Sequence, residues 1–128
     1  MDEEQEERRV ALDTLKKYGV RWAVLAAMRV DMAKQGIEVP QEVDEALRDS
    51  HVKLASGCFS PCEVGMSLSK VEGLLVSRAY LLGEERFREW FNLLGQSMQG
   101  QIDPSKISEI PILKPVEMDC KFLGCSCS

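Results

Sequence analysis

Hydrophobic residues recur at intervals of three and four over most of the first 100 residues, which is the spacing of one face of an α-helix. Glycine and proline interrupt this pattern at a few places, where they end one helix or start the next. The pattern predicts four helices, over residues 3–35, 40–56, 61–82 and 84–99. We therefore expect an all-α fold, a compact bundle of about four main helices.

The first predicted helix carries a long apolar stripe, formed by Ala11, Leu15, Tyr18, Trp22, Leu25, Met28 and Met32. Within it the segment VRWAVLAAM, residues 20–28, is apolar almost all round. A helix that is hydrophobic on all sides is covered by several neighbours, so we predict that this segment is the centre of the bundle. Gly19 marks a place where the helix could bend or divide.

The third predicted helix begins at the sequence SPCE. Ser60 is the expected N-cap, Pro61 suits the first helical position, and Glu63 would complete a capping box. One side of this helix carries small residues at every fourth position, namely Gly65, Ser69, Gly73 and Ser77. Two glycines inside a helix each cost about 1 kcal/mol relative to alanine. We interpret this side as an interface, against the first helix or a second copy of the chain, because small residues let helices approach closely.

The fourth predicted helix is expected to turn its large side chains inward, namely Phe87, Trp90, Phe91, Leu94 and Met98. Beyond it, residues 101–128 differ in character, because three prolines exclude a long helix. Apolar side chains alternate there with polar ones, at Val116, Met118, Cys120 and Phe122. We predict an extended, partly strand-like C-terminal tail that docks on the helical domain of residues 1–100.

Composition limits the classes of partner. The net charge is −5 and the pI about 5.0, whereas nucleic-acid binding normally requires a concentrated basic surface. No run approaches the roughly 20 apolar residues that span a bilayer, and the first ten residues lack the apolar core of a signal peptide. We expect a cytoplasmic protein that binds neither nucleic acid nor membrane.

The five cysteines fall into two groups, Cys58 with Cys62 and Cys120 with Cys125 and Cys127. If the groups meet, their thiolates could bind zinc or an iron–sulfur cluster. Alternatively Cys58, Cys62 and Cys120 are buried hydrophobic residues, with Cys125 and Cys127 at a frayed end. A third interpretation is a redox thiol, because the first turn of a helix favours the thiolate form of a cysteine such as Cys62. The spacings do not match a zinc ribbon, so the sequence leaves these three interpretations open.

Catalytic motifs are missing from the sequence: there is no glycine-rich phosphate loop, no H-E-x-x-H and no nucleophile elbow. The single histidine, His51, falls on the inner stripe of the second helix and is expected to be a partly buried structural residue. We therefore expect an interaction or assembly module that forms a homo-oligomer, a dimer, rather than an enzyme. A thiolate metal protein and a thiol redox protein remain the alternatives.

Overall fold

The structure is a computed structural model. It describes the backbone of residues 2–56 and 60–103 and the side chains of residues 17–56 and 60–103. The described residues form α1 (Asp2–Lys34), α2 (Gln41–Ser56), α3 (Pro61–Ala79), the 3-10 helix η1 (Tyr80–Leu82) and α4 (Glu84–Met98). No strand occurs within these ranges. The all-α prediction is confirmed, while the predicted strand-like tail lies outside the described residues.

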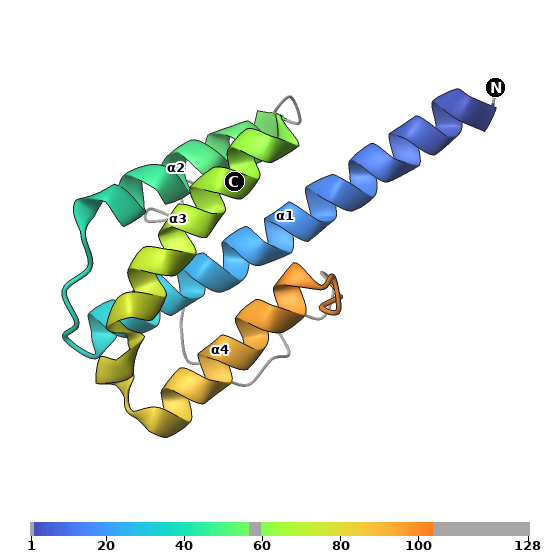
Figure 1. The fold of residues 1–128 in the computed structure, drawn as a ribbon. Helices are drawn as coiled ribbons and strands as arrows, with labels where there is room; N and C mark the ends of the chain where they lie inside the picture. The colour runs from blue at the N-terminus through green and yellow to red at the C-terminus, as the bar shows by residue number, and fades with distance from the viewer. Residues whose placement is uncertain (1, 57–59, 104–128) are drawn as a thin grey trace, which may run out of the picture.

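Helix α1 is the centre of the fold and contacts each of α2, α3 and α4. In Figure 1, α2 and α3 lie on one side of α1 and α4 on the other, and the N-terminal part of α1 extends beyond the bundle. The predicted central segment, residues 20–28, is buried except for the half-buried Ala23. Gly19 neither ends nor divides the helix. The continuous apolar surface of α1 thus determines which helix the others surround.

The turn after α1 follows from one glycine. Gly36 has a φ of +79°, a left-handed conformation that glycine adopts without a steric penalty. Its N–H donates to the carbonyl of Ala33, and the N–H of Ile37 donates to the carbonyl of Met32. This is the Schellman arrangement, and Ile37 is buried as its hydrophobic contact. The turn leads the chain into α2.

Helix α3 begins at Pro61, as predicted, but the predicted capping box is wrong. The Ser60 side chain makes no cap hydrogen bond, and the Glu63 carboxylate lies 3.7 Å from the ammonium group of Lys53 on α2. Proline already fixes the first backbone angle of the helix. The start of α3 therefore depends on Pro61 and on the Ser60 carbonyl, which accepts the N–H of Val64.

In α4 the predicted inward set was partly wrong. Trp90 and Leu94 are buried and Phe87 is half-buried, but Phe91 is 56% and Met98 47% exposed. The reason is that α4 packs mainly on α1, and a single neighbour covers only a narrow stripe of a helix. Apolar residues turned away from that stripe therefore remain in contact with solvent.

Candidate interaction surface

The predicted cysteine site is largely outside the described residues. Cys62 lies in the first turn of α3 and is an exposed free thiol. The other four candidates, Cys58, Cys120, Cys125 and Cys127, fall in the ranges that the structure does not describe. Among described residues, no group of three or more histidine, cysteine, aspartate or glutamate side chains could hold a metal ion. Zinc or iron–sulfur binding therefore stays a prediction.

Among the described residues one carboxylate, that of Asp31, is fully buried, and it joins α1 to α4. Asp31, 1% exposed, accepts two hydrogen bonds from Arg86, both at 2.7 Å, and one from Trp90 Nε1 at 2.8 Å. Burial by itself raises the pKa of Asp31, but the hydrogen bonds from Arg86 and Trp90 outweigh it, so the pKa lies below its ordinary value. The carboxylate is charged, fully paired and closed to solvent, which suits a structural role rather than acid–base catalysis.

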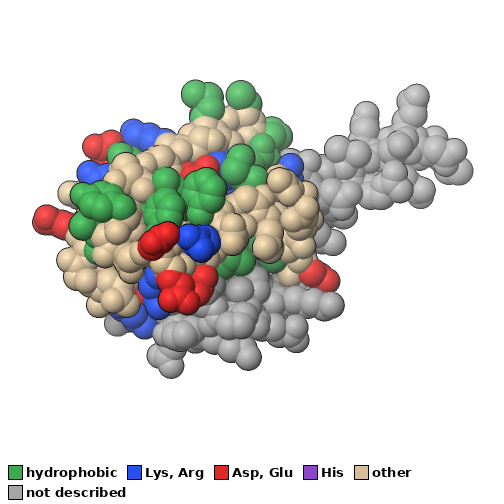
Figure 2. All heavy atoms as spheres, turned by 60° about the horizontal axis from the view of Figure 1, so that its bottom comes forward, with side chains coloured by type: hydrophobic (Ala, Val, Ile, Leu, Met, Phe, Trp, Pro, Cys, Tyr) green, Lys and Arg blue, Asp and Glu red, His purple; other side chains and the backbone are tan. Residues whose placement is uncertain are grey.

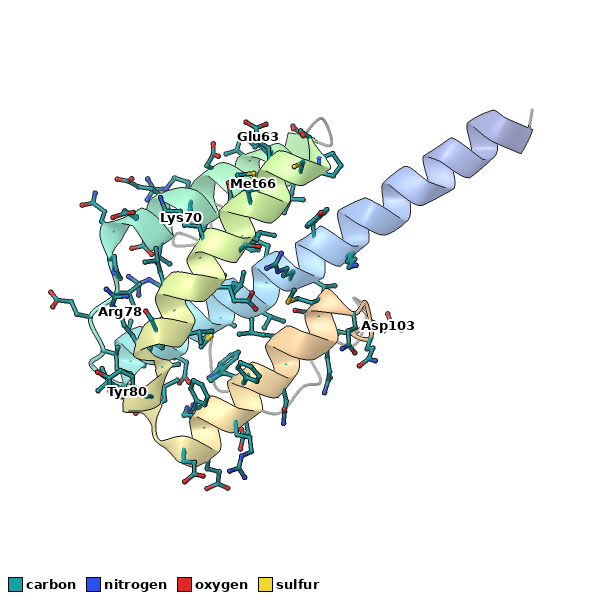
Figure 3. All side chains as sticks on the ribbon, viewed as in Figure 1. Glu63, Met66, Lys70, Arg78, Tyr80 and Asp103 are labelled. Atoms are coloured by element: carbon teal, nitrogen blue, oxygen red, sulfur yellow. The ribbon has the colours of Figure 1, made fainter. Side chains whose placement is uncertain are left out.

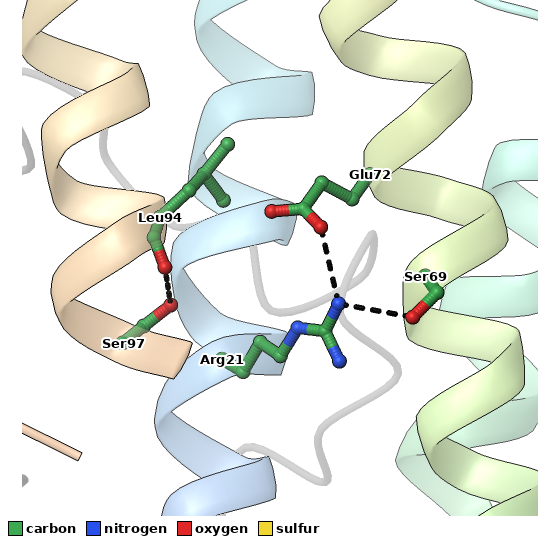
Figure 4. A network of polar contacts seen from close by, with 5 residues as sticks. All are labelled: Arg21, Ser69, Glu72, Leu94 and Ser97. Carbon is green, nitrogen blue, oxygen red and sulfur yellow. Dashed lines mark hydrogen bonds and ion pairs between the residues drawn. The ribbon is translucent and has the colours of Figure 1, made fainter. Parts of the chain in front are cut away.

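A second polar contact joins α1 to α3. Arg21 is 7% exposed, and its Nη2 donates to Ser69 Oγ at 3.2 Å and to Glu72 Oε2 at 3.1 Å. Figure 4 shows this contact beside the last turn of α4, where Ser97 Oγ donates to the Leu94 carbonyl. The Nε atom of Arg21 is buried and has no hydrogen-bond partner among the described residues.

Polar contacts also join α1 to α2. Arg29 donates to both carboxylate oxygens of Asp44, at 2.7 and 3.1 Å. Trp22 Nε1 donates to the Leu47 carbonyl at 2.8 Å, and the Trp22 ring lies 4.9 Å from the half-buried ring of His51. His51 is thus part of the packing, as expected. An arginine–carboxylate pair thus fixes each neighbouring helix to α1.

The surface of α3 that points away from the bundle is exposed along its whole length. We call it the outer face of α3 and define it as Cys62, Met66, Ser69, Gly73, Ser77 and Tyr80. The spacing of three and four residues puts these positions on one side of the helix. Met66 is 70% and Tyr80 69% exposed. Tyr80 has helical backbone angles, so it continues the phase of α3.

None of these outer-face residues is charged, although charged residues make up 29% of the chain. Two charged side chains, Lys70 and Arg78, border the face on the α2 side, and both are bonded within the subunit (Figure 3). Lys70 pairs with Glu42 at 3.3 Å, and Arg78 bends back to donate to Leu74 O and Ser77 Oγ on its own helix. The outer face of α3 is therefore a strip of uncharged residues.

The four residues of the predicted small-residue side of α3, Gly65, Ser69, Gly73 and Ser77, do not all have the same surroundings in the structure. Gly65 lies against α1, because a Cβ atom there would be 3.2 Å from the Tyr18 hydroxyl. Ser69 is exposed and lies at the edge of the outer face nearest α1, where it accepts a hydrogen bond from Arg21. Gly73 and Ser77 are exposed, and no described atom lies within 4 Å of a Cβ built at Gly73. Gly65 thus allows close packing within the chain, whereas Gly73 and Ser77 face outward.

Sequence reasoning missed Met66 and Tyr80. Each lies seven residues from Gly73, and neither falls on the buried stripe of α3. Searching the helix for apolar residues two turns from the central glycine, off the inner stripe, would have found both.

Helix α4 carries a second exposed apolar group, formed by Phe91 and Met98, beside the half-buried Phe87. The rings of Phe87 and Phe91 stack at 5.8 Å. An exposed ion pair between Glu84 and Arg88 lies on the same helix within one turn of Phe91. Figure 2 shows hydrophobic and charged side chains intermixed on the face brought forward from the bottom of Figure 1. This group is therefore less uniform than the outer face of α3.

A shallow hollow of about 300 Å³ lies at the α1–α2 turn and is lined by Glu38, Val39, Pro40, Gln41 and Arg78. Its two charged side chains do not form a recognisable catalytic set. In the described part of the chain, no helix is both long and apolar enough to cross a bilayer. Comparison with family models, curated proteins and solved structures gave no match. Function therefore has to be argued from the surfaces of this chain alone.

Proposed function

We propose that this protein is a cytoplasmic assembly module rather than an enzyme, and that it forms a homodimer through the outer face of α3. The observation that carries the proposal is an exposed, uncharged helix face with Gly73 at its centre and Met66 and Tyr80 at its ends. The metal-binding and redox alternatives depend on cysteines that, except for Cys62, lie outside the described residues.

The position of Gly73 supports this proposal energetically. An exposed glycine inside a helix costs about 1 kcal/mol relative to alanine, and no described atom is close enough to Gly73 to require the missing side chain. A second helix packed on this side would use the space, because a glycine at a crossing point allows close contact between backbones. Met66 and Tyr80 would then leave solvent, which favours association.

The area of the outer face determines how tightly we expect the two copies to bind. From Cys62 to Tyr80 the helix rises by about 27 Å at 1.5 Å per residue, and a helix is about 10 Å wide. The face therefore offers about 270 Å² per copy, well below the roughly 800 Å² per partner of a standard stable interface. We expect a weak dimer that forms at concentrations on the order of 100 µM and dissociates on dilution.

Sedimentation velocity from about 5 to about 500 µM tests the proposal over the range expected of a small interface. The wild type should change from monomer to dimer. Gly73→Leu should remain monomeric throughout, because a leucine at the crossing point separates the two helices. Its monomer should be at least as stable as the wild type, since leucine is the better helix former and position 73 has open space around it.

Gly95→Leu is the matched control. Gly95 is also inside a helix with no described atom within 4 Å of a Cβ built on it, but it lies on α4, away from the outer face of α3. This variant should dimerise like the wild type. A wild type that stays monomeric at the highest concentration, or a Gly73→Leu variant that dimerises normally, would contradict the proposal.

A further inference from the structure

The turn after α4 directs the chain back towards the bundle. Gly100 has a φ of +70°, and the N–H of Gln101 donates to the carbonyl of Gln96. This is a second Schellman arrangement, which ends a helix with a sharp turn. Ile102 is half-buried and packs against the core. The chain beyond Asp103 therefore starts beside the C-terminal end of α4 (Figure 3).

An apolar surface on α4 lies within reach of that chain. Phe87, Phe91 and Met98 are four and seven residues apart, which puts them on one side of the helix. Phe91 is 56% and Met98 47% exposed, and the rings of Phe87 and Phe91 stack at 5.8 Å. We call these three residues the apolar flank of α4. Measured from Met98 at 1.5 Å per residue, Phe91 lies about 10 Å and Phe87 about 16 Å towards the start of the helix.

The sequence after α4 has a matching spacing. Ile107, Ile110 and Leu113 follow one another at intervals of three residues, among prolines at 104, 111 and 115. Prolines favour the polyproline II conformation, in which every third residue lies on the same side and the rise is about 3.1 Å per residue. Measured from Ile107, Ile110 would then lie about 9 Å and Leu113 about 19 Å along the chain. Both values agree with the spacing of the apolar flank to about 2 Å.

We propose that residues 107–113 dock on the apolar flank of α4 in the same chain, in the polyproline II conformation and antiparallel to the helix. Ile107, Ile110 and Leu113 then pack on the three flank residues in reverse order, so that Ile110 contacts Phe91. Aromatic surfaces commonly bind this conformation, because its backbone is extended before it binds. The proposal does not depend on the dimer: a chain that is monomeric at every concentration would refute the dimer and leave this contact unaffected.

Reach selects the antiparallel direction. The four residues from Asp103 to Ile107 span at most about 14 Å. Because Asp103 lies beside the C-terminal end of α4 (Figure 3), Ile107 can contact Met98 there. Phe87 lies about 16 Å farther along the helix, beyond the reach of Ile107. The chain therefore contacts the C-terminal end of the apolar flank first and its N-terminal end last.

Charge is complementary in this register. Lys114 would lie about 22 Å along the chain from Ile107, and Glu84 lies about 21 Å along the helix from Met98. Glu84 and Glu85 form the acidic first turn of α4, so the lysine meets opposite charge. Near the other end of the helix, Lys106 would lie beside the last turn, where the helix dipole favours a cation.

The contact is small, but it joins two parts of one chain. A short connection gives the docking segment an effective concentration on the order of millimolar, so this contact does not need the area of a stable interface between separate proteins. Covering the exposed parts of Phe91 and Met98 removes apolar surface from water, which favours docking.

Cysteine cross-linking tests the position of the segment without removing its apolar contacts. In a chain whose five native cysteines are serine, Gly95→Cys combined with Ser108→Cys should form a disulfide within one molecule on oxidation at low protein concentration. Positions 95 and 108 lie within about 2 Å of each other along the helix axis in the proposed register. Gly95 also has room for a Cβ, since no described atom lies within 4 Å of that position.

Val52→Cys combined with Ser108→Cys is the matched control, because Val52 is 61% exposed but lies on α2. This pair should cross-link at least about tenfold more slowly, since docking raises the effective concentration only at α4. Equal rates for the two pairs would show that the segment does not select α4 and would refute the proposal. Disulfides between two molecules at positions 95 and 108 would assign the apolar flank to a second copy, which also refutes it.

A double-mutant cycle tests the contact energetically in the full chain. Phe91→Ala and Ile110→Ala remove the same contact, so each should lower Tm by about 3 to 6 °C, and the double variant should lower it no further than the larger single effect. Val52→Ala with Ile110→Ala should be additive, since these residues lie apart in the proposed arrangement. An unchanged Tm for Ile110→Ala, or additive losses for Phe91→Ala and Ile110→Ala, would contradict the proposed register.

Discussion

Replacing Asp31 with alanine removes the acceptor at the centre of the contact between α1 and α4. Three hydrogen bonds are lost together, two from Arg86 and one from Trp90. Trp90 is fully buried, so its Nε1–H would be left without an acceptor inside the core. Arg86 has a side chain that is 36% exposed, and water can replace part of what it loses.

The expected loss of stability follows from these two different environments. An orphaned buried donor costs about 1 to 3 kcal/mol. The partly solvated Arg86 contributes about 1 kcal/mol or less once solvent screening is taken into account. Together they predict that Asp31→Ala lowers the free energy of unfolding by about 1 to 4 kcal/mol, and by more than about 2 kcal/mol where the Trp90 donor finds no water. For a chain of this length that corresponds to a decrease in Tm of about 4 to 16 °C.

Thermal and urea unfolding followed by circular dichroism would measure the effect, with Asp44→Ala as the matched control. Asp44 also accepts two hydrogen bonds from one arginine, Arg29, but both side chains are partly exposed, at 24% and 20%. That variant should lose only about 1 kcal/mol. Equal losses for the two variants would refute the argument that burial of the Trp90 donor makes Asp31 important.

Three further experiments test single contributions to stability: the charge of Asp31, the hydrogen bond of Trp22 and the backbone conformation of Gly83. The pKa of Asp31 in the folded protein lies below its ordinary value of 3.8. Its stabilising contribution is therefore complete above about pH 5 and is lost as the pH falls below 3.8. The stability difference between wild type and Asp31→Asn, measured by urea unfolding at several pH values, should shrink over that range and not above it. Trp22→Phe removes the hydrogen bond to the Leu47 carbonyl and should lower the free energy of unfolding by about 1 kcal/mol; a Tm equal to that of the wild type would show that this bond is not stabilising. Gly83→Ala should lower stability by about 1 to 3 kcal/mol in the same assay, because Gly83 has a φ of +96° that alanine rarely adopts; an unchanged Tm would contradict that strain.

The helices and the central position of α1 could be predicted because they depend on local pattern. Periodic apolar residues, Gly36 and Pro61 specify where helices begin and end, and the all-round apolar segment of α1 specifies which helix is in the middle. By contrast, the orientation of α4 depends on how many neighbours it has. Phe91 and Met98 have the same hydrophobicity as core residues, and only the three-dimensional arrangement shows that no described helix covers them.

The polar interior could not have been predicted for a related reason. Asp31, Arg21 and Arg86 look like surface residues in the sequence, and their partners are 48 to 59 positions away. Nothing local distinguishes them from the many charged residues on solvated helix faces. The small-residue side of α3 was visible as a pattern, but its division between α1 and solvent follows from how the two helices lie against each other.

The distribution of the polar contacts bears on the proposed dimer. Arg29, Arg21 and Asp31 connect α1 to α2, α3 and α4 in turn, and each connection comes from the central helix. Helix α3 is therefore held to the bundle by its apolar stripe and by the contacts of Glu72 and Ser69 with Arg21. Among the described residues, Ser69 is the one outer-face residue with a polar contact to α1, while Lys70 and Arg78 pair with α2 or with α3 itself. A substitution such as Gly73→Leu can consequently change association without weakening the bundle. That independence is what makes the outer face of α3 testable as an assembly surface, because a loss of dimerisation there cannot be attributed to unfolding of the subunit.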